Sequence, residues 1–427
     1  MKTGVGAVIA VCLVGCTAAA PSVTTSEEPR SAAPSSLEPP SATASEQPAP
    51  TGVPTLSPSI APAGPLALTW SSVTFPGRIA SLLGDGARFV AVGRAGDTYE
   101  DPHAAWTSTD GLSWTTHAVP IASLDEIDAQ FPDQGPDFAS RWAGMGQLVR
   151  LGDTVYSIGS FSINDGVRPV GWRWTDGGAW QAITSSSPYY EQGIPEDVVS
   201  GDGAIVAARM NVGLNYVEAD STVWTWRPDT SWVQSDLSVN DDEPIVITDL
   251  AWSDGTFLAV GFVSAASEEE TTTLTAWTSP DGATWTRIDP PETGRELCDV
   301  EPHPAGGFVA LGVEADRTVA WTWDVEAGWA GGAALQDGPG HGTSGATPFQ
   351  GLCQLLRVGG RIVAVTSMEE STRLWSSTDG VSWSTAEGVP GSAQDAAAIA
   401  DRIVVATVDY TEDGDPTYTV HTAAAAP

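Results

Sequence analysis

The chain has 427 residues, of which 54 are acidic and 18 basic, and its formal net charge is −36 at pH 7. Such a charge repels nucleic acid and anionic membrane surfaces, so we exclude both as partners. The sequence has no Gly-x-Ser-x-Gly elbow and no phosphate-binding loop, and its five histidines show no metal-ligand spacing. Dedicated hydrolase and nucleotide-binding motifs are therefore absent.

The N-terminal segment has the pattern of a bacterial lipoprotein signal. A basic start at Lys2 is followed by an apolar run at residues 5–14 and by small residues before Cys16. At about ten residues, the run is too short to span a bilayer as a helix. We expect residues 1–15 to be a signal peptide and Cys16 to carry the lipid. The chain would then be exported and anchored to the outer face of the cytoplasmic membrane, at the cell surface.

Residues 16–65 form a segment rich in Pro, Ser, Thr and Ala, without apolar periodicity. A segment of this composition buries too little apolar surface to fold. We predict a disordered tether with a root-mean-square span of roughly 40 Å, which would lift the rest of the chain away from the membrane.

Beyond residue 65, two tryptophans recur eight residues apart. The clearest copy, at residues 106–114, reads Trp-Thr-Ser-Thr-Asp-Gly-Leu-Ser-Trp. Asp-Gly between two short runs of β-branched and aromatic residues predicts a hairpin, because Gly accepts a positive φ and Asp accepts backbone N–H bonds. We expect one tryptophan of each pair on each arm. The six pairs are Trp106/Trp114, Trp172/Trp180, Trp224/Trp232, Trp277/Trp285, Trp321/Trp329 and Trp375/Trp383.

An apolar run that follows Gly or Asp marks a further strand in every repeat, and a shorter run precedes it. One repeat is therefore four strands in roughly 40–55 residues, the period of a β-propeller blade. We predict an all-β domain at residues 66–427, a seven-bladed β-propeller of four-stranded antiparallel blades. The seven apolar runs are residues 89–93, 155–159, 205–208, 257–261, 308–312, 362–365 and 403–406.

The two ends of this domain are complementary. Residues 66–75, with Trp70, match an outer strand but have no inner strands before them. The last repeat, residues 393–422, has three strands and no closing tryptophan. We expect the N-terminal strand to complete the seventh blade and close the ring, which removes an open sheet edge.

One polar position recurs on the innermost strands, eight residues before each apolar run and nine in the fifth repeat. Innermost strands line the central channel, so we expect a polar ring there. Its four carboxylates need water or a hard cation such as Ca²⁺ to offset their repulsion, and Asp197, Asp249, Asp299 and Asp395 are the candidate ligands. The ring residues are Ser81, Gln147, Asp197, Asp249, Asp299, Gln354 and Asp395.

The chain has four cysteines, and two of them, Cys12 and Cys16, belong to the export signal. Cys298 and Cys353 each stand one residue before a ring position of adjacent repeats. Equivalent sites on neighbouring inner strands are close together. In an oxidising compartment this predicts a disulfide rather than two free thiols.

In a propeller, the loops from strand 2 to strand 3 and from strand 4 to the next strand 1 share one face, which we call the loop-rich face. All the long segments fall there, and binding residues concentrate on loops held by a rigid scaffold. We therefore expect a monomeric module that binds an extracellular protein or glycan on this face. The segments are residues 120–144, 188–191, 268–270, 336–350 and 409–415.

Residues 108–114, Ser-Thr-Asp-Gly-Leu-Ser-Trp, resemble the Asp-box, or bacterial neuraminidase repeat. The box occurs in sialidases and in many propellers that are not sialidases. The resemblance covers most of residues 66–427. It implies a propeller fold, with the box as a structural turn on the face away from the usual active site.

Residues 77–83, Gly-Arg-Ile-Ala-Ser-Leu-Leu, also resemble the first blade of sialidases, which carries an Arg-Ile-Pro motif. Carried over, the resemblance implies that Arg78 binds the substrate carboxylate and that Asp101 protonates the leaving group. Tyr410 or Tyr418 would then be the nucleophile. A sialidase-like glycoside hydrolase is thus the alternative to a binding module.

Overall fold

We describe the fold from a computed structural model. It describes residues 66–425 except 99–100, 121–142, 164–165, 184–193, 212–219, 229, 231, 236, 238–244, 264–272, 295, 315–316, 336–351, 369–370 and 412–413. The predicted signal peptide, Cys16 and the tether lie outside the described residues. The described residues belong to one compact unit, Ser59–Pro427. Within them, no helix is long and apolar enough to cross a membrane.

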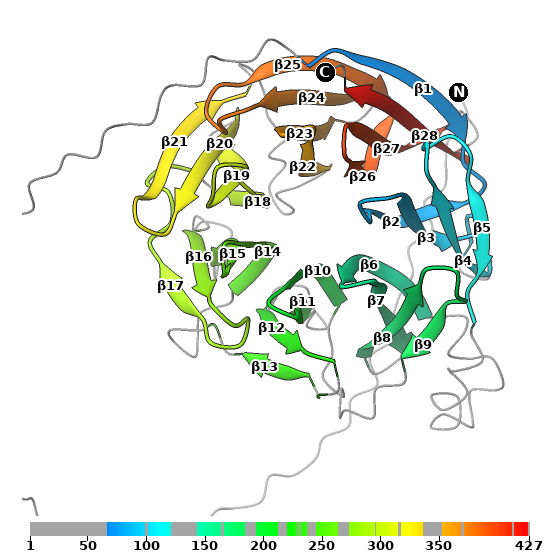
Figure 1. Ribbon diagram of the computed structural model, residues 1–427, viewed down its shortest axis with the longest axis horizontal. Helices are drawn as coiled ribbons and strands as arrows, with labels where there is room; N and C mark the ends of the chain where they lie inside the picture. The colour runs from blue at the N-terminus through cyan, green and yellow to red at the C-terminus, as the bar shows by residue number, and fades with distance from the viewer. Residues whose placement is uncertain are drawn as a thin grey trace, which may run out of the picture. The chain divides into compact units, whose positions relative to one another are not determined.

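The described residues form seven sheets of four strands each, arranged as blades around a centre (Figure 1). This confirms the predicted all-β, seven-bladed propeller. From the innermost strand outward, blade one consists of β2 (Arg78–Gly84), β3 (Phe89–Arg94), β4 (His103–Ser108) and β5 (Thr115–Ala118), and blade two of β6 (Ala143–Leu151), β7 (Thr154–Ile163), β8 (Gly166–Thr175) and β9 (Gln181–Ile183). Blade three consists of β10 (Ile194–Gly201), β11 (Ala204–Asn211), β12 (Asp220–Trp226) and β13 (Val233–Ser235), blade four of β14 (Ile245–Ser253), β15 (Thr256–Val263), β16 (Thr273–Ser279) and β17 (Thr286–Ile288), and blade five of β18 (Glu296–Pro302), β19 (Phe308–Glu314), β20 (Arg317–Asp324) and β21 (Gly328–Ala334). Blade six consists of β22 (Cys353–Val358), β23 (Arg361–Met368), β24 (Ser371–Ser377) and β25 (Ser384–Pro390), and blade seven of β26 (Ser392–Ile399), β27 (Arg402–Tyr410), β28 (Pro416–Ala425) and β1 (Leu68–Thr74).

The seventh blade combines the two ends of the described chain. Strand β1 pairs antiparallel with β28, with Leu68 opposite Ala425 and Thr74 opposite Thr419. The indole Nε1 of Trp70 donates to the carbonyl oxygen of Glu387 on β25, at 3.0 Å. Strand β1 therefore contacts blade six as well as blade seven, and Figure 1 shows it beside β25 and β28.

The hydrophobic core lies between neighbouring blades. The apolar run of each second strand is buried, as in β3, where Phe89, Val90, Ala91 and Val92 are all 0% exposed. One cluster joins Ile79, Phe89 and Trp106 of blade one to Val404 and Val420 of blade seven. Burial between sheets explains why these strands read as apolar runs rather than as alternating patterns.

The repeated Asp-Gly stretch is a longer turn than a two-residue hairpin. In blade one the last pair of the ladder is Thr107 with Thr115, so the connection runs over residues 108–114. Trp106 lies on β4, whereas Trp114 lies in the turn and donates from Nε1 to the carbonyl oxygen of Gly111 at 3.0 Å. The expectation of one tryptophan on each arm is therefore wrong for this copy, because the second ring caps the turn, whereas in blade five Trp321 lies on β20 and Trp329 on β21.

In three of these turns one carboxylate accepts several hydrogen bonds from the turn itself. Asp281 Oδ1 accepts hydrogen bonds from the backbone N–H groups of Ala283 (2.9 Å) and Thr284 (2.8 Å), and from the hydroxyl of Ser279 (3.1 Å). Gly282 takes φ +75°, a left-handed value that suits glycine. The turns at Asp110 and Asp379 repeat this pattern.

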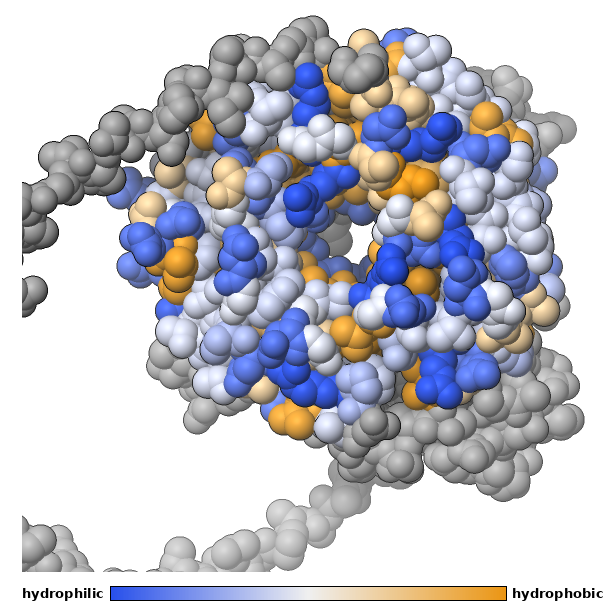
Figure 2. Space-filling model, viewed as in Figure 1, coloured by the Kyte–Doolittle hydropathy of each residue, from blue (hydrophilic) through white to orange (hydrophobic). Residues whose placement is uncertain are grey.

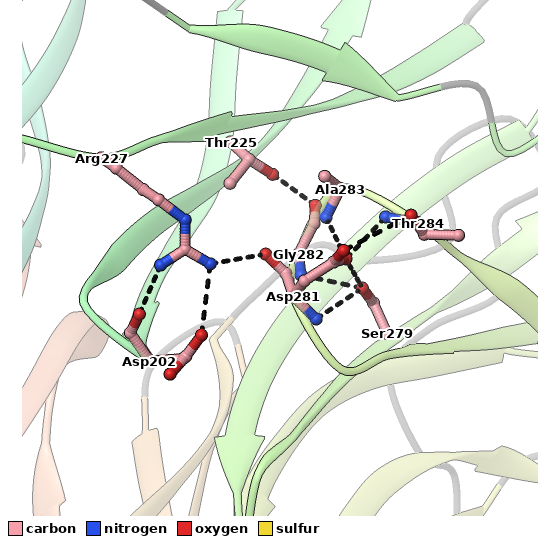
Figure 3. Close-up of polar contacts among 8 residues, drawn as sticks. All are labelled: Asp202, Thr225, Arg227, Ser279, Asp281, Gly282, Ala283 and Thr284. Atoms are coloured by element: carbon pink, nitrogen blue, oxygen red, sulfur yellow. Dashed lines mark hydrogen bonds and ion pairs between the residues drawn. The ribbon is translucent and has the colours of Figure 1, made fainter. Parts of the chain in front are cut away.

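The same turn joins one blade to the blade before it (Figure 3). Arg227 of blade three donates to the carbonyl oxygen of Asp281 at 3.3 Å, and Thr225 donates to that of Gly282. Arg227 is also paired with Asp202, at 3.2 Å. We call the side that carries these turns, and the turns from strand 1 to strand 2, the turn face.

Candidate functional site

The structure brings all seven predicted ring residues to one cavity at the centre of the propeller. The cavity has a volume of about 320 Å³, and Figure 2 shows the opening at the centre of the ring. The cavity extends from the ring along the innermost strands toward the turn face, where Glu301 and Arg357 also line it. The ring residues that line it are Ser81, Gln147, Asp197, Asp249, Asp299, Gln354 and Asp395.

The ring side chains form a closed circle of hydrogen bonds, each to the backbone of the next blade. Six accept a bond from the N–H that follows the next ring position, whereas Gln147 donates to the carbonyl that precedes it. The bonds, donor first, are Leu148 N to Ser81 Oγ (3.2 Å), Gln147 Nε2 to Glu196 O (2.9 Å), Leu250 N to Asp197 Oδ2 (2.8 Å), Val300 N to Asp249 Oδ2 (2.6 Å), Leu355 N to Asp299 Oδ1 (3.0 Å), Ala396 N to Gln354 Oε1 (2.9 Å) and Leu82 N to Asp395 Oδ2 (2.6 Å).

A local irregularity places these side chains. In blades one to five and in blade seven, the pairing of the two innermost strands shifts register at the ring position, as between Ile79 and Ser81. A bulge of this kind re-aims a side chain and disrupts the ladder locally. Blade six has no such shift, yet Gln354 makes the same kind of bond to the neighbouring blade.

Burial and mutual repulsion change how the ring carboxyls titrate. Burial raises the pKa of Asp249, and the charges of Asp299 and Asp197 raise it further. Burial also raises the pKa of Asp197 and Asp299, and it raises that of Asp395 to about 6. The pKa of Glu301 is raised to about 8, again chiefly by burial, although Arg357 acts in the opposite direction. Burial therefore makes the charged form of all four ring carboxyls less stable than it would be in water.

Cation binding by the ring carboxylates stays a prediction. No three His, Cys, Asp or Glu side chains among the described residues are grouped so that they would hold a metal ion. One oxygen of each of Asp197, Asp249, Asp299 and Asp395 accepts a hydrogen bond from a backbone N–H of the next blade. We therefore make no proposal for Ca²⁺.

Cys298 and Cys353 are joined by a disulfide, with 6.1 Å between their Cα atoms. The two residues lie next to Asp299 and Gln354 on the innermost strands of blades five and six. The bond therefore adds a covalent link at the level of the ring.

The residues implied by the sialidase resemblance lie on the loop-rich face, but they do not all suit the implied roles. Asp101 Oδ2 accepts bonds from the N–H (2.7 Å) and hydroxyl (2.8 Å) of Thr98. These bonds lower the pKa of Asp101 below its usual range. A general acid must keep its proton near neutral pH, so this environment is the opposite of what the role requires.

Arg78 and the two late tyrosines do lie near one another, around a residue that the sequence reading missed. Tyr418 shares a side-chain hydrogen bond with Asp97, and the charges of Asp97, Arg78 and Tyr410 all act on it. Burial, followed by Asp97, raises the pKa of the Tyr418 hydroxyl. The ring of Tyr410 is 70% exposed. We call Arg78, Asp97, Tyr410 and Tyr418 the loop-face cluster.

Asp97 had no motif to reveal it, because it stands in the short loop after β3. Glu301 and Arg357 were missed for a similar reason, since each lies past the aligned ring position. The long segments expected to carry the site lie mainly outside the described residues: 121–142, 188–191, 268–270, 336–350 and part of 409–415.

No protein-family model matches this chain. A search of curated proteins likewise gave no match. Among solved structures, the chain is similar to the polysaccharide lyase Uly1, with 10% identity, 83% of this chain and 91% of the other covered, and a TM-score of 0.52. It is also similar to virginiamycin B lyase from Staphylococcus aureus, with 10% identity, 84% and 100% covered, and a TM-score of 0.50. An α-L-arabinanase of Penicillium chrysogenum matches with 13% identity, 66% and 94% covered, and a TM-score of 0.41. At these identities the likeness establishes the propeller fold alone.

Proposed function

We propose that this propeller binds an extracellular glycan on its loop-rich face, at the loop-face cluster, while a lipid on Cys16 anchors the chain to the membrane. The observation that supports the proposal is the proximity of Arg78, Asp97, Tyr410 and Tyr418. The four residues come from blades one and seven, which puts the cluster where the two ends of the described chain meet.

The chemistry of the cluster suits a sugar. The guanidinium of Arg78 presents several N–H donors, and the carboxylate of Asp97 accepts from hydroxyls. The exposed ring of Tyr410 offers a flat apolar surface with a polar edge. A few polar groups beside an aromatic surface are typical of a small-ligand site, in which the polar groups set orientation and the ring adds contact area.

A glycan array with the purified full-length protein tests the proposal. We expect binding to a subset of glycans, lost in Arg78→Gln and weakened about tenfold or more in Tyr410→Ala. Arg373→Gln removes the same charge from an exposed site on β24 and is the matched control. An array without binders, or binders that both cluster variants retain, would contradict the proposal.

A sialidase-type hydrolase is the second candidate, and the observation that favours it is the position of Arg78 near Tyr410 and Tyr418. The raised pKa of Tyr418 makes its phenolate harder to form, which leaves Tyr410 as the nucleophile. Release of a fluorescent phenol from an aryl sialoside measures this activity. Turnover that disappears in Tyr410→Phe would establish hydrolysis, and turnover unchanged in that variant would exclude the assigned nucleophile.

A further inference from the structure

Arg357, on the turn face, lines both the central cavity and a surface depression. It is an exposed side chain near the end of β22, and it lines the central cavity together with Glu301. It also lines a surface depression of about 560 Å³ between the first turns of blades six and seven. Gly359, Gly360, Ala400 and Asp401 form the rest of that depression. A ligand seated there would contact Arg357 from either side.

A comparison within the chain shows that the guanidinium of Arg357 is available. Arg150 holds the same place in blade two, two residues before the glycine that begins its turn. Its guanidinium is used in the fold: Nε donates to Gly152 O at 2.9 Å, and Nη1 donates to Asp85 O of the neighbouring blade. Arg357 has no such hydrogen bond and no ion pair within 4.0 Å among the described residues, although its charge acts on the Glu301 carboxyl.

The turn beside Arg357 differs from its counterparts in a way that keeps the depression open. Blades three and four have Asp-Gly at this turn, with Asp202 and Asp254 at φ 47° and 49°. Blade six has Gly359 and Gly360, at φ 54° and 78°, in the same conformation. A Cβ built on either glycine meets no atom within 4 Å. Blades three and four therefore have a carboxylate at the position of Gly359, whereas blade six has no side chain there.

We propose that Arg357 and this depression bind the carboxylate of an acidic sugar, on the face opposite the loop-face cluster. A guanidinium binds carboxylates with two parallel N–H bonds, a geometry that few other side chains offer. The exposed carboxylate of Asp401 accepts from sugar hydroxyls, and the uncovered glycine backbone admits the flat side of a sugar ring. The Glu301 carboxyl, whose pKa is raised to about 8, holds its proton at neutral pH and donates it in a hydrogen bond instead of repelling the ligand.

The test uses the full-length protein, with D-glucuronate as the probe and D-glucose as its uncharged counterpart, at fixed ionic strength. Saturation-transfer NMR and titration report binding. We expect D-glucuronate to bind and D-glucose not to bind. Arg357→Gln should weaken glucuronate binding about tenfold or more, and Arg373→Gln should leave it unchanged.

Gly359→Asp provides an independent variant. Asp202 and Asp254 show that this turn accepts Asp at the same φ, so the fold should be retained, and unchanged melting temperatures check this. The new carboxylate would pair with Arg357 and fill the depression, so binding should again fall about tenfold.

No binding of D-glucuronate, or equal binding in Arg357→Gln and Gly359→Asp, would overturn this second site. If binding is lost in Arg78→Gln and retained in Arg357→Gln, the acidic sugar binds on the loop-rich face. In that case the proposed function stands and this inference fails.

Discussion

At the residue scale, aspartate does two opposite things in this propeller. In the turns, backbone N–H groups donate to the carboxylate and stabilise its charge, so the pKa of Asp110 falls to about 2. In the ring, burial disfavours the charge, and the pKa of Asp395 rises to about 6. The many acidic residues therefore do not share one pKa, because the environment of each carboxyl decides whether its charged or its neutral form is more stable.

Glu296 gives the clearest prediction for pH dependence. It is buried at the start of β18, and burial alone raises its pKa from 4.5 to about 8. The folded state then binds a proton that the unfolded state has lost, so the free energy of unfolding falls as pH rises from about 4.5 to 8. Ionisation of Glu296 should lower the free energy of unfolding by on the order of 3 kcal/mol across this range, and Glu296→Gln should abolish this decrease.

Thermal unfolding at pH 5, 6.5 and 8 measures the effect, and exposed Glu292→Gln is the control. The Glu296→Gln variant should lose less stability toward pH 8 than the wild type and the control. Equal slopes in all three proteins would show that Glu296 ionises normally in the fold.

At the scale of a single element, the Asp-Gly turn ties its own sheet to the blade before it. Asp281→Ala removes two backbone N–H bonds and two hydroxyl bonds to the carboxylate, and it loosens the turn that Arg227 and Thr225 contact. We expect a loss of about 2 kcal/mol. Chemical denaturation would measure it against Asp289→Ala, an exposed aspartate, and a midpoint equal to that control would contradict the role of this turn.

The disulfide is an element of a different kind, since it links the inner strands of two blades. It closes a loop with a sequence separation of 55, for which the chain-entropy estimate is a stabilisation of about 4 kcal/mol. Cys298→Ser with Cys353→Ser should lower the denaturation midpoint accordingly. Mass spectrometry of the unreduced protein should find neither thiol alkylated, and ready alkylation of both would mean that the bond is absent from the protein.

The innermost strands show how much of the candidate site can be predicted from the sequence. Their polar positions follow from the alignment of repeats, because each repeat places equivalent residues at equivalent points of a blade. The partner of each side chain does not follow, since the N–H of Leu250, which donates to Asp197, belongs to the neighbouring sheet and stands 53 residues away in the sequence. Asp97 belongs to no repeated motif, and the sequence does not show that the guanidinium of Arg357, unlike that of Arg150, is left without a hydrogen-bond partner among the described residues, so only the three-dimensional structure reveals both features. The turns were predicted as turns, but the capping role of Trp114 depends on its side-chain direction.

At the scale of the whole molecule, strand β1 joins the first described residues to the last. It pairs with β28 along seven residue pairs, and it contacts β25 through Trp70. Phe75, just after it, packs against Trp106 and Trp114, with ring centroids 4.9 and 5.3 Å apart. Blade seven, blade six and blade one thus all depend on one short segment.

Deletion of residues 66–75 should therefore abolish the single cooperative unfolding transition, because β28 would become an open edge and the core beside Trp106 would be exposed. Differential scanning calorimetry compares the truncated protein with one that lacks only residues 17–60. A truncated protein that melts like this control would mean that the ring is held closed without β1.

The hydrogen bonds around the channel follow a local rule, because a ring side chain needs only the backbone of the following blade. This pattern does not depend on the number of blades. If the gene segment for one blade were duplicated in frame, the extra blade would find a partner on each side by the same rule, and it would bring its own Asp-Gly turn to dock on its predecessor. The bonding pattern would therefore tolerate a change in copy number, and divergence among the copies, such as the glutamines of blades two and six, leaves it intact.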